Sequence, residues 1–261
     1  MNTYQEEWLH KGNFDLYEKF RRYLPCPENP YLADGIARRG IQEIEALDIG
    51  GGSGTSSLEI ISFLNAREIT VKKWEVVDVS REQLAAFKQK VAHLDSPHFS
   101  FAHYSWSEFA LRKKYNFVLS LHSWYGINGW REEAKAKNTL RKFTEAISKD
   151  GLGVIVITAK DNVMATFSNQ IRGGHYRATG NEICAKLSKL GIRFEQETAN
   201  LPIPALLAAG ELTCAAEAIY PFILGMADLS HIRKELTSYL SEWIAVHGEW
   251  FSAVDFIWIR K

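Results

Sequence analysis

The sequence predicts an α/β protein with a doubly wound, mostly parallel sheet of seven strands. Short β-branched segments alternate with longer helical patterns along the chain, which is typical of parallel strands joined by crossover helices. A glycine-rich turn, Gly50-Gly51-Gly52-Ser53-Gly54, follows the first of these segments, and an acidic residue, Asp78, ends the second. We expect both at the carboxyl edge of the sheet, where ligands bind in such folds.

Seven strands and the helices between them follow from the hydrophobic pattern and its punctuation. Strands are predicted at residues 44–49, 74–79, 99–103, 115–121, 153–158, 194–201 and 256–260. Helices are predicted at residues 13–24, around 58–64, and at 80–91, 138–147 and 179–190. Two of them open with the spacing of a capping box, at Ser80 and Thr179. Helix stops are expected at residues 149–151 and at Gly191.

The length of 261 residues fits one domain, which we divide into three parts. Residues 1–40 are expected to form an N-terminal helical lid, and residues 41–203 with 249–261 the cofactor-binding sheet core. Residues 204–248 are mainly helical and too long for a simple connection, so they are predicted as a helical insert before the last strand.

The composition excludes some classes of binding partner and indicates the cellular compartment. Lys plus Arg and Asp plus Glu each total 31, so the net charge is zero and no basic surplus indicates nucleic acid or a membrane surface. The apolar stretch 205–227 contains Glu211 and Glu217, which favours a buried helix over a membrane span. The polar, acidic start of the chain does not resemble a signal peptide. We therefore expect a cytoplasmic protein with neither a nucleic-acid nor a membrane partner.

Cysteine and histidine spacing does not indicate a metal site. The three cysteines, Cys26, Cys184 and Cys214, form no C-x-x-C pair, and we expect three reduced thiols. No H-E-x-x-H or comparable spacing occurs among the histidines, so no metal is predicted.

The glycine turn favours a nucleoside ligand over a dinucleotide. Its spacing is G-x-G-x-G, and the position of the third dehydrogenase glycine holds Thr55, so an NAD-dependent oxidoreductase is disfavoured. Asp78 is suited to accept two hydrogen bonds from a ribose diol. Asp48, inside the first strand, fits a cofactor with a cationic amino-acid end. A purely structural tight turn and a solvated Asp78 remain the alternatives.

These residues resemble the class I S-adenosylmethionine-dependent methyltransferases. The stretch 47–54 is similar to the first motif of that class and, more narrowly, to the I-G-G-G-x-G turn of the histamine N-methyltransferase family. Residues 75–83 resemble the family's ribose-binding segment, and residues 20–24 its N-terminal helix. Residues 140–143 with 154–158, and 252–259, can also be aligned with it.

The resemblance implies roles for individual residues. It implies that S-adenosyl-L-methionine is the cofactor, with S-adenosyl-L-homocysteine as its product. Its binding residues would be Asp48, Gly50, Gly52, Gly54, Asp78, Gln83, Trp106, Ser107 and Leu121. The catalytic candidates are His122 and Tyr125, and the substrate-binding candidates are Glu28, Asn29, Trp124, Phe167 and Ser252.

Several positions differ from the histamine enzymes and make histamine itself an unexpected substrate. The acidic residue that anchors the amine in that family aligns with Asn29, one position after Glu28, and an amide near the carboxyl end aligns with Ser252. Two pocket tryptophans are replaced by Val163 and Phe167. The pocket is therefore expected to be larger and less polar, suiting a bulkier amine or an aromatic natural product.

The remaining pocket candidates each have a structural alternative. His122 is suited to accept a proton, or only to shape the pocket. Trp124, Tyr125 and Trp130 would stack an aromatic substrate or pack in the core. The basic segment 172–177 would be a gate or a surface loop.

We thus expect a methyltransferase that moves a methyl group to a nitrogen of a small amine or aromatic acceptor by direct displacement. The alternatives are carbon or oxygen methylation of an aromatic or indole-type metabolite, because one fold serves several reactions, and a non-catalytic cofactor-binding protein. The sequence makes no prediction of the oligomeric state.

Overall fold

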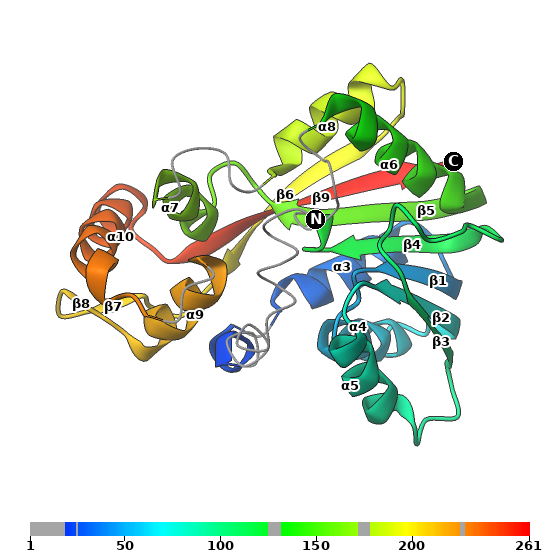
Figure 1. Cartoon of the computed structure of the whole chain (residues 1–261), viewed down its shortest axis with the longest axis horizontal. Helices are drawn as coiled ribbons and strands as arrows, with labels where there is room; N and C mark the ends of the chain where they lie inside the picture. The colour runs from blue at the N-terminus through cyan, green and yellow to red at the C-terminus, as the bar shows by residue number, and fades with distance from the viewer. Residues whose placement is uncertain (1–18, 25, 125–131, 172–177, 225–227) are drawn as a thin grey trace.

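A seven-stranded sheet runs through the centre of the molecule, with helices on both faces (Figure 1). The structure is a computed structural model, and it describes residues 19–24, 26–124, 132–171, 178–224 and 228–261. The strands of the sheet are β1 (Glu43–Ile49), β2 (Thr70–Asp78), β3 (His98–His103), β4 (Tyr115–Leu121), β5 (Ile147–Thr158), β6 (Glu195–Pro202) and β9 (Phe251–Arg260). A separate two-stranded hairpin is formed by β7 (Leu207–Ala208) and β8 (Glu211–Leu212).

The strand order confirms the predicted doubly wound fold. The order is β3-β2-β1-β4-β5-β9-β6, so β1 and β4 are neighbours at the centre although two strands separate them in the sequence. The pairs β1–β2, β1–β4, β2–β3 and β4–β5 are parallel, whereas β9 is antiparallel to both of its neighbours. The carboxyl ends of β1, β2 and β4 therefore meet at one edge, which is the ligand-binding edge of such sheets.

Strand residues alternate between two helical layers. On one face, β1 contributes Ala46 to a cluster with α3 (Glu28–Arg38), α4 (Thr55–Asn65) and α5 (Arg81–Val91). On the other face, Leu47 and Ile49 of the same strand join a second cluster with α6 (Glu133–Ala146) and α8 (Gly180–Lys189). This alternation follows from the two-residue period of a strand that is covered on both sides.

A third hydrophobic cluster lies beyond the end of the sheet and packs the helices of residues 204–248 against α7 (Val163–Ile171) and the start of β9. It comprises residues of α7, α9 (Cys214–Leu224) and α10 (Arg233–His247), with the short helix η2 (Ser230–Ile232) between the last two. Leu24 and Phe20, from the N-terminal side, pack against it. Figure 1 shows these helices grouped at one end of the molecule. Among the described residues, no helix is both long and apolar enough to cross a membrane.

The structure corrects several predicted boundaries. The residues expected to stop a helix at 149–151 lie inside β5, where the register shifts relative to β4, and Asp150 takes a left-handed φ of 62°. The helices α3 and α7 have no counterpart in the predicted set; Pro27 and Pro30, which indicated a break in the chain, lie at the N-cap and in the first turn of α3. The predicted positions 125–131 and 172–177 lie outside the described residues.

Candidate active site

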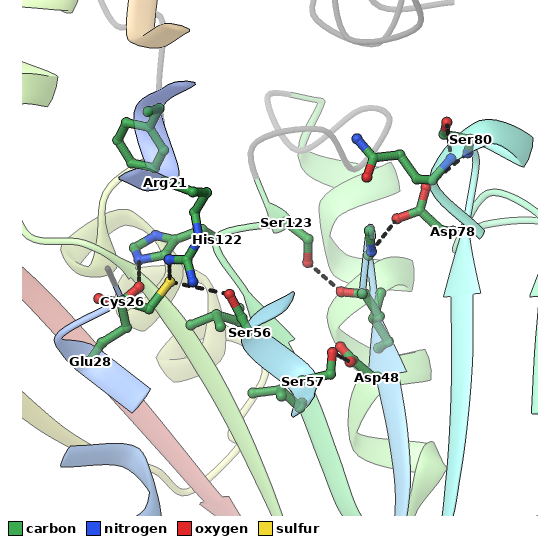
Figure 2. A pocket seen from close by; sticks show the side chains of 18 of the residues that line it. Arg21, Cys26, Glu28, Asp48, Ser56, Ser57, Asp78, Ser80, His122 and Ser123 are labelled. Atoms are coloured by element: carbon green, nitrogen blue, oxygen red, sulfur yellow. Dashed lines mark hydrogen bonds and ion pairs between the residues drawn. The ribbon is translucent and has the colours of Figure 1, made fainter. Parts of the chain in front are cut away.

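A cavity of about 280 Å³ opens at the carboxyl edge of the sheet. Its wall includes the ends of β1, β2 and β4 and the segment after β3, together with residues from the N-terminal segment, α7, α9 and β9. Such sites in doubly wound sheets are formed by loops that diverge from the switch point between two central strands. In Figure 2, Asp78 and Ser80 lie on one side of the cavity and Glu28 and His122 on the other.

The glycine turn connects β1 to α4 through three left-handed residues. Gly50, Gly52 and Gly54 have φ values of 75°, 58° and 80°, a conformation that residues with a Cβ adopt rarely. A Cβ on Gly50 would collide with Ser123, and one on Gly54 would collide with the ring of Phe87. At Gly52 the nearest atom to an added Cβ is Oε1 of Gln83, at 3.6 Å. Glycine is therefore required for packing at Gly50 and Gly54 and for the backbone conformation at Gly52.

Asp78 ends β2 directly beside this turn. Its Oδ2 accepts a hydrogen bond from the amide of Gly52 at 3.0 Å, and its Oδ1 accepts one from the amide of Ser80 at 2.8 Å. Burial raises the pKa of Asp78, whereas these backbone donors favour the carboxylate and oppose the rise. Ser80 also caps α5 by accepting a bond from the amide of Gln83 at 3.2 Å.

Gln83 places an unsatisfied acceptor next to Asp78. Its Oε1 is buried and has no hydrogen-bond partner among the described residues. Because a buried carbonyl oxygen without a partner is costly, this atom is suited to bind a donor group of a ligand. Asp78 and Gln83 together offer the acceptors that a nucleoside hydroxyl pair requires.

Asp48 lies deeper, between the turn and the strand layer. Its Oδ2 accepts hydrogen bonds from Oγ of Ser57 at 2.6 Å and from Nε1 of Trp74 at 3.0 Å. Burial raises its pKa to about 6, despite these two donors. A cation that reached this carboxylate would favour its ionised form.

At the opposite end of the cavity, an acid and a histidine from distant segments come together. Oε1 of Glu28, the first residue of α3, lies 3.5 Å from Nε2 of His122, which follows β4 (Figure 2). Burial opposes the ionisation of Glu28, but the hydrogen bond and charge of His122 outweigh it, so the pKa of Glu28 is lowered. Beside this pair, Arg21 contacts the sulfur of Cys26 and forms an ion pair with Glu59 at 3.2 Å.

The structure brings most of the predicted site residues to this cavity but not all of them. Its wall includes Glu28, Asp48, Gly50, Gly52, Asp78, Gln83, Trp106, Leu121, His122 and Ser252. Asn29 is buried behind the wall and donates to Glu59, and Ser107 lies in an exposed turn after β3. Trp124 and Phe167 are buried in the second and third hydrophobic clusters. Gly54 lies below the turn, against Phe87, and Tyr125 is outside the described residues.

Other wall residues were not predicted as site residues from the sequence. Those with polar or sulfur-containing side chains include Arg21, Cys26, Ser56, Ser57, Tyr104, Ser105 and Ser123. Ser123 directly follows His122, and its hydroxyl donates to the carbonyl oxygen of Ile49, so its proximity in sequence was the one available signal. Arg21 and Cys26 reach the cavity only because the N-terminal segment folds back over α4, which no local pattern indicates.

Comparisons with known proteins agree with this architecture. YcgJ from Bacillus subtilis aligns with a TM-score of 0.62 and 16% identity, over 90% of this chain and 98% of that one. The magnesium protoporphyrin IX methyltransferase of Synechocystis, solved with bound S-adenosylhomocysteine, aligns with a TM-score of 0.57 and 12% identity over 99% of each chain. No family model matches the chain.

The fold is that of the class I S-adenosylmethionine-dependent methyltransferases, as the motifs predicted. In sequence, the chain is similar to histamine N-methyltransferase B of Xenopus laevis, with 24% identity over 172 residues. That match covers 58% of this chain and 56% of the relative, so the chain matches only about half the length of this curated relative.

Proposed function

We propose that the chain is an S-adenosylmethionine-dependent methyltransferase that acts on a small molecule. The observation that carries this proposal is the meeting of the glycine turn with Asp78 at one wall of the cavity, where the amide of Gly52 lies 3.0 Å from the carboxylate. A Cβ-free turn and an adjacent strand-end acid are what an adenosyl nucleoside requires of a doubly wound sheet.

The residues present fit this cofactor. Asp78 and the unsatisfied Oε1 of Gln83 would hold the ribose hydroxyls, and the backbone at Gly50 and Gly52 would lie against the amino-acid end. Asp48 would face the ammonium group of that end, since its raised pKa marks a buried carboxylate without a full counter-charge. Trp106 and Leu121 complete this part of the wall.

When bound, the cofactor supplies a methyl group activated by a sulfonium charge. The chain's own residues must then orient the acceptor and exclude water, and orientation alone contributes up to about 7–11 kcal/mol in favourable reactions. The proposed acceptor is a nitrogen of a small amine or of an aromatic compound, with His122 at the position of a proton acceptor. The N-terminal segment and the insert, both of which reach the cavity through Phe20 and Phe222, would close over it.

Carbon or oxygen methylation and non-catalytic cofactor binding are the alternatives, since fold similarity does not decide the reaction.

Two measurements distinguish these alternatives from the proposed function. Calorimetry with S-adenosylmethionine and S-adenosylhomocysteine tests binding, with NADH as the comparison ligand. Incubation with methyl-labelled S-adenosylmethionine and a panel of amines, phenols and indoles then tests transfer. Failure of both adenosyl ligands to bind contradicts the proposal; binding without transfer to any compound supports the non-catalytic alternative.

A further inference from the structure

The end of the cavity remote from Asp78 contains an acid–histidine pair. Oε1 of Glu28 is 3.5 Å from Nε2 of His122, and the Glu28 side chain is only 8% exposed whereas that of His122 is 32% exposed. The carboxylate is therefore enclosed behind the imidazole, which reaches further toward the cavity. A buried acid that holds one face of a partly exposed histidine fixes the orientation of the ring and favours its proton on the facing nitrogen.

The backbone holds His122 in a conformation that costs free energy. Its φ is 50°, in the left-handed region, and its amide donates to the carbonyl oxygen of Val156 at 2.9 Å. Non-glycine residues in this region are uncommon and are found repeatedly at active sites, where neighbouring structure compensates for the strain. The turn after β4 thus directs the histidine toward the cavity independently of its contact with Glu28.

Both acids at this end have a neighbouring partner. Glu28 faces His122, and Glu59 behind the wall is paired with Arg21 at 3.2 Å. Among the described residues, the titratable and charged groups of the cavity wall are Arg21, Cys26, Glu28 and His122 at this end, and Asp48, Asp78 and Tyr104 toward the glycine turn. The elements α7, α9 and β9 contribute only Met164, Ala165, Phe222, Ile223, Ser252 and Val254 to the wall. An acceptor that enters the cavity therefore meets the more exposed imidazole first, and an ammonium group would compete with His122 for Glu28.

We propose that Glu28 positions His122 as a base and that the acceptor is a neutral compound with a weakly acidic hydroxyl or azole N–H group, rather than an ammonium ion. This inference rests on the proposed methyltransferase function; it narrows the nitrogen acceptor to an azole and adds the hydroxyl acceptor that was named there as an alternative. The acceptor's O–H or N–H bond breaks and its proton moves to the imidazole, at Nδ1 when the Nε2 proton faces Glu28. The electron pair left on oxygen or nitrogen forms the bond to the methyl carbon, and the pair of the methyl–sulfur bond stays on sulfur.

This step transfers positive charge rather than creating it. The charge lost at sulfur reappears on the imidazolium, next to the Glu28 carboxylate, which is ionised because His122 keeps its pKa low despite burial. A carboxylate in this position stabilises the protonated ring and the transition state that leads to it. Glu28 is accordingly a positioning residue, and His122 is the residue that contacts the acceptor.

Binding selectivity tests the acceptor class without requiring turnover. Wild-type protein saturated with S-adenosylhomocysteine is titrated at pH 7.5 with matched aromatic probes: 4-methylcatechol, 4-phenylimidazole and phenethylamine. We expect the phenol or the azole to bind at least about 10-fold more tightly than the ammonium compound, which corresponds to about 1.4 kcal/mol. Tighter binding of phenethylamine, or no binding by any of the three, overturns the acceptor class.

Two variants test the roles of the pair with the best acceptor. For His122→Asn we expect kcat at pH 7 to fall about 100-fold or more and, when the acceptor is the catechol, to recover as the pH approaches the pKa of its hydroxyl group, which then ionises unaided. For Glu28→Gln we expect kcat to fall about 10-fold with KM within about 3-fold, and the acidic limb of the pH profile to move. Glu145→Gln, an exposed acid on α6, is the control and should leave the profile unchanged.

Cofactor affinity separates failure of this inference from failure of the proposed function. S-adenosylhomocysteine should bind all three variants as tightly as the wild type, which also shows that they are folded. If His122→Asn shows no recovery at high pH with the catechol, or Glu28→Gln raises KM alone, Glu28 and His122 are binding residues and the inference is wrong. If the wild type does not bind S-adenosylhomocysteine, the methyltransferase proposal itself is wrong.

Discussion

The ring of Phe20 stacks on that of Phe222, with centroids 4.5 Å apart and planes inclined by 28°. Phe20 belongs to the N-terminal segment and Phe222 to α9 of the insert, and both line the cavity. This contact joins the two parts of the chain that are proposed to close over the acceptor. Stacked aromatic pairs contribute about 0.5–1.5 kcal/mol beyond the area that they bury.

Replacement of Phe222 should loosen the N-terminal segment locally. For Phe222→Ala we expect amide hydrogen exchange at residues 20–24 to become about 5- to 10-fold faster, because about 1 kcal/mol of contact energy is lost. Exchange in β2 should not change. Phe63→Ala, which removes an aromatic ring from α4, is the control and should leave residues 20–24 as they are. Unchanged exchange in Phe222→Ala would show that other contacts hold this segment.

Removing the charge of Asp78 should weaken cofactor binding. For Asp78→Asn we expect the dissociation constant of S-adenosylhomocysteine to rise about 10- to 100-fold, since hydrogen bonds to a charged group contribute about 1.5–3 kcal/mol. Calorimetry measures the change, and Asp95→Asn, at an exposed position after α5, is the matched control. Equal affinities for the two variants would remove the ribose assignment.

Asp48 should make the stability of the free protein depend on pH. Its folded pKa is raised from 3.8 to about 6, so its contribution to stability is complete below the unfolded value and is lost as the pH rises through 6. The neutral variant Asp48→Asn avoids this loss. We expect it to be more stable than the wild type at pH 8, by at most about 3 kcal/mol, with the difference shrinking towards pH 4.

Urea unfolding at pH 5, 6.5 and 8 measures this difference. The same substitution should weaken the binding of S-adenosylmethionine, because the carboxylate that destabilises the free protein is the proposed partner of the cofactor's ammonium group. A variant that is less stable than the wild type at every pH would show that the hydrogen bonds from Ser57 and Trp74 require the carboxylate.

Glycine at position 54 should be required for packing rather than for ligand contact. For Gly54→Ala we expect a loss of about 2–4 kcal/mol in unfolding free energy, the sum of the left-handed conformation and the collision with Phe87. Gly191→Ala is the matched control, because Gly191 has a similar φ of 68° but open space around it, so it should lose only about 1 kcal/mol. Equal losses for the two variants would show that the Phe87 ring moves aside.

The sequence predicted the sheet well because its signal is local. The central strand β4 (Tyr115–Leu121), a short apolar run, begins and ends as predicted. The helix α7 was missed although Asn162 is a recognisable N-cap residue, whose side chain accepts hydrogen bonds from the amides of Met164 and Ala165. β5 was shortened because Lys149-Asp150-Gly151 resembles a helix stop, although these residues continue the strand.

At the wall beside the glycine turn the local patterns predicted the geometry, whereas at the other end the family resemblance indicated Glu28 and His122 as site residues but not their contact with each other. Gly50 and Gly52 lie in the turn after β1 and Asp78 is the last residue of β2, and both positions follow directly from the strand pattern. The contact between Glu28 and His122 joins two residues that are far apart in the sequence. It depends on the position of α3, a helix that the sequence did not predict. Trp124 illustrates the same limit, since it follows His122 closely but points into the core beside Phe143.

The indole of Trp74 donates its N–H to Asp48, 3.0 Å away. Binding of a positive group at that carboxylate would change the electric field across the indole ring, and would therefore shift the wavelength of its fluorescence emission. A shift in the emission wavelength of the wild type on adding S-adenosylmethionine, which Trp74→Phe should not show, would report cofactor binding without a label.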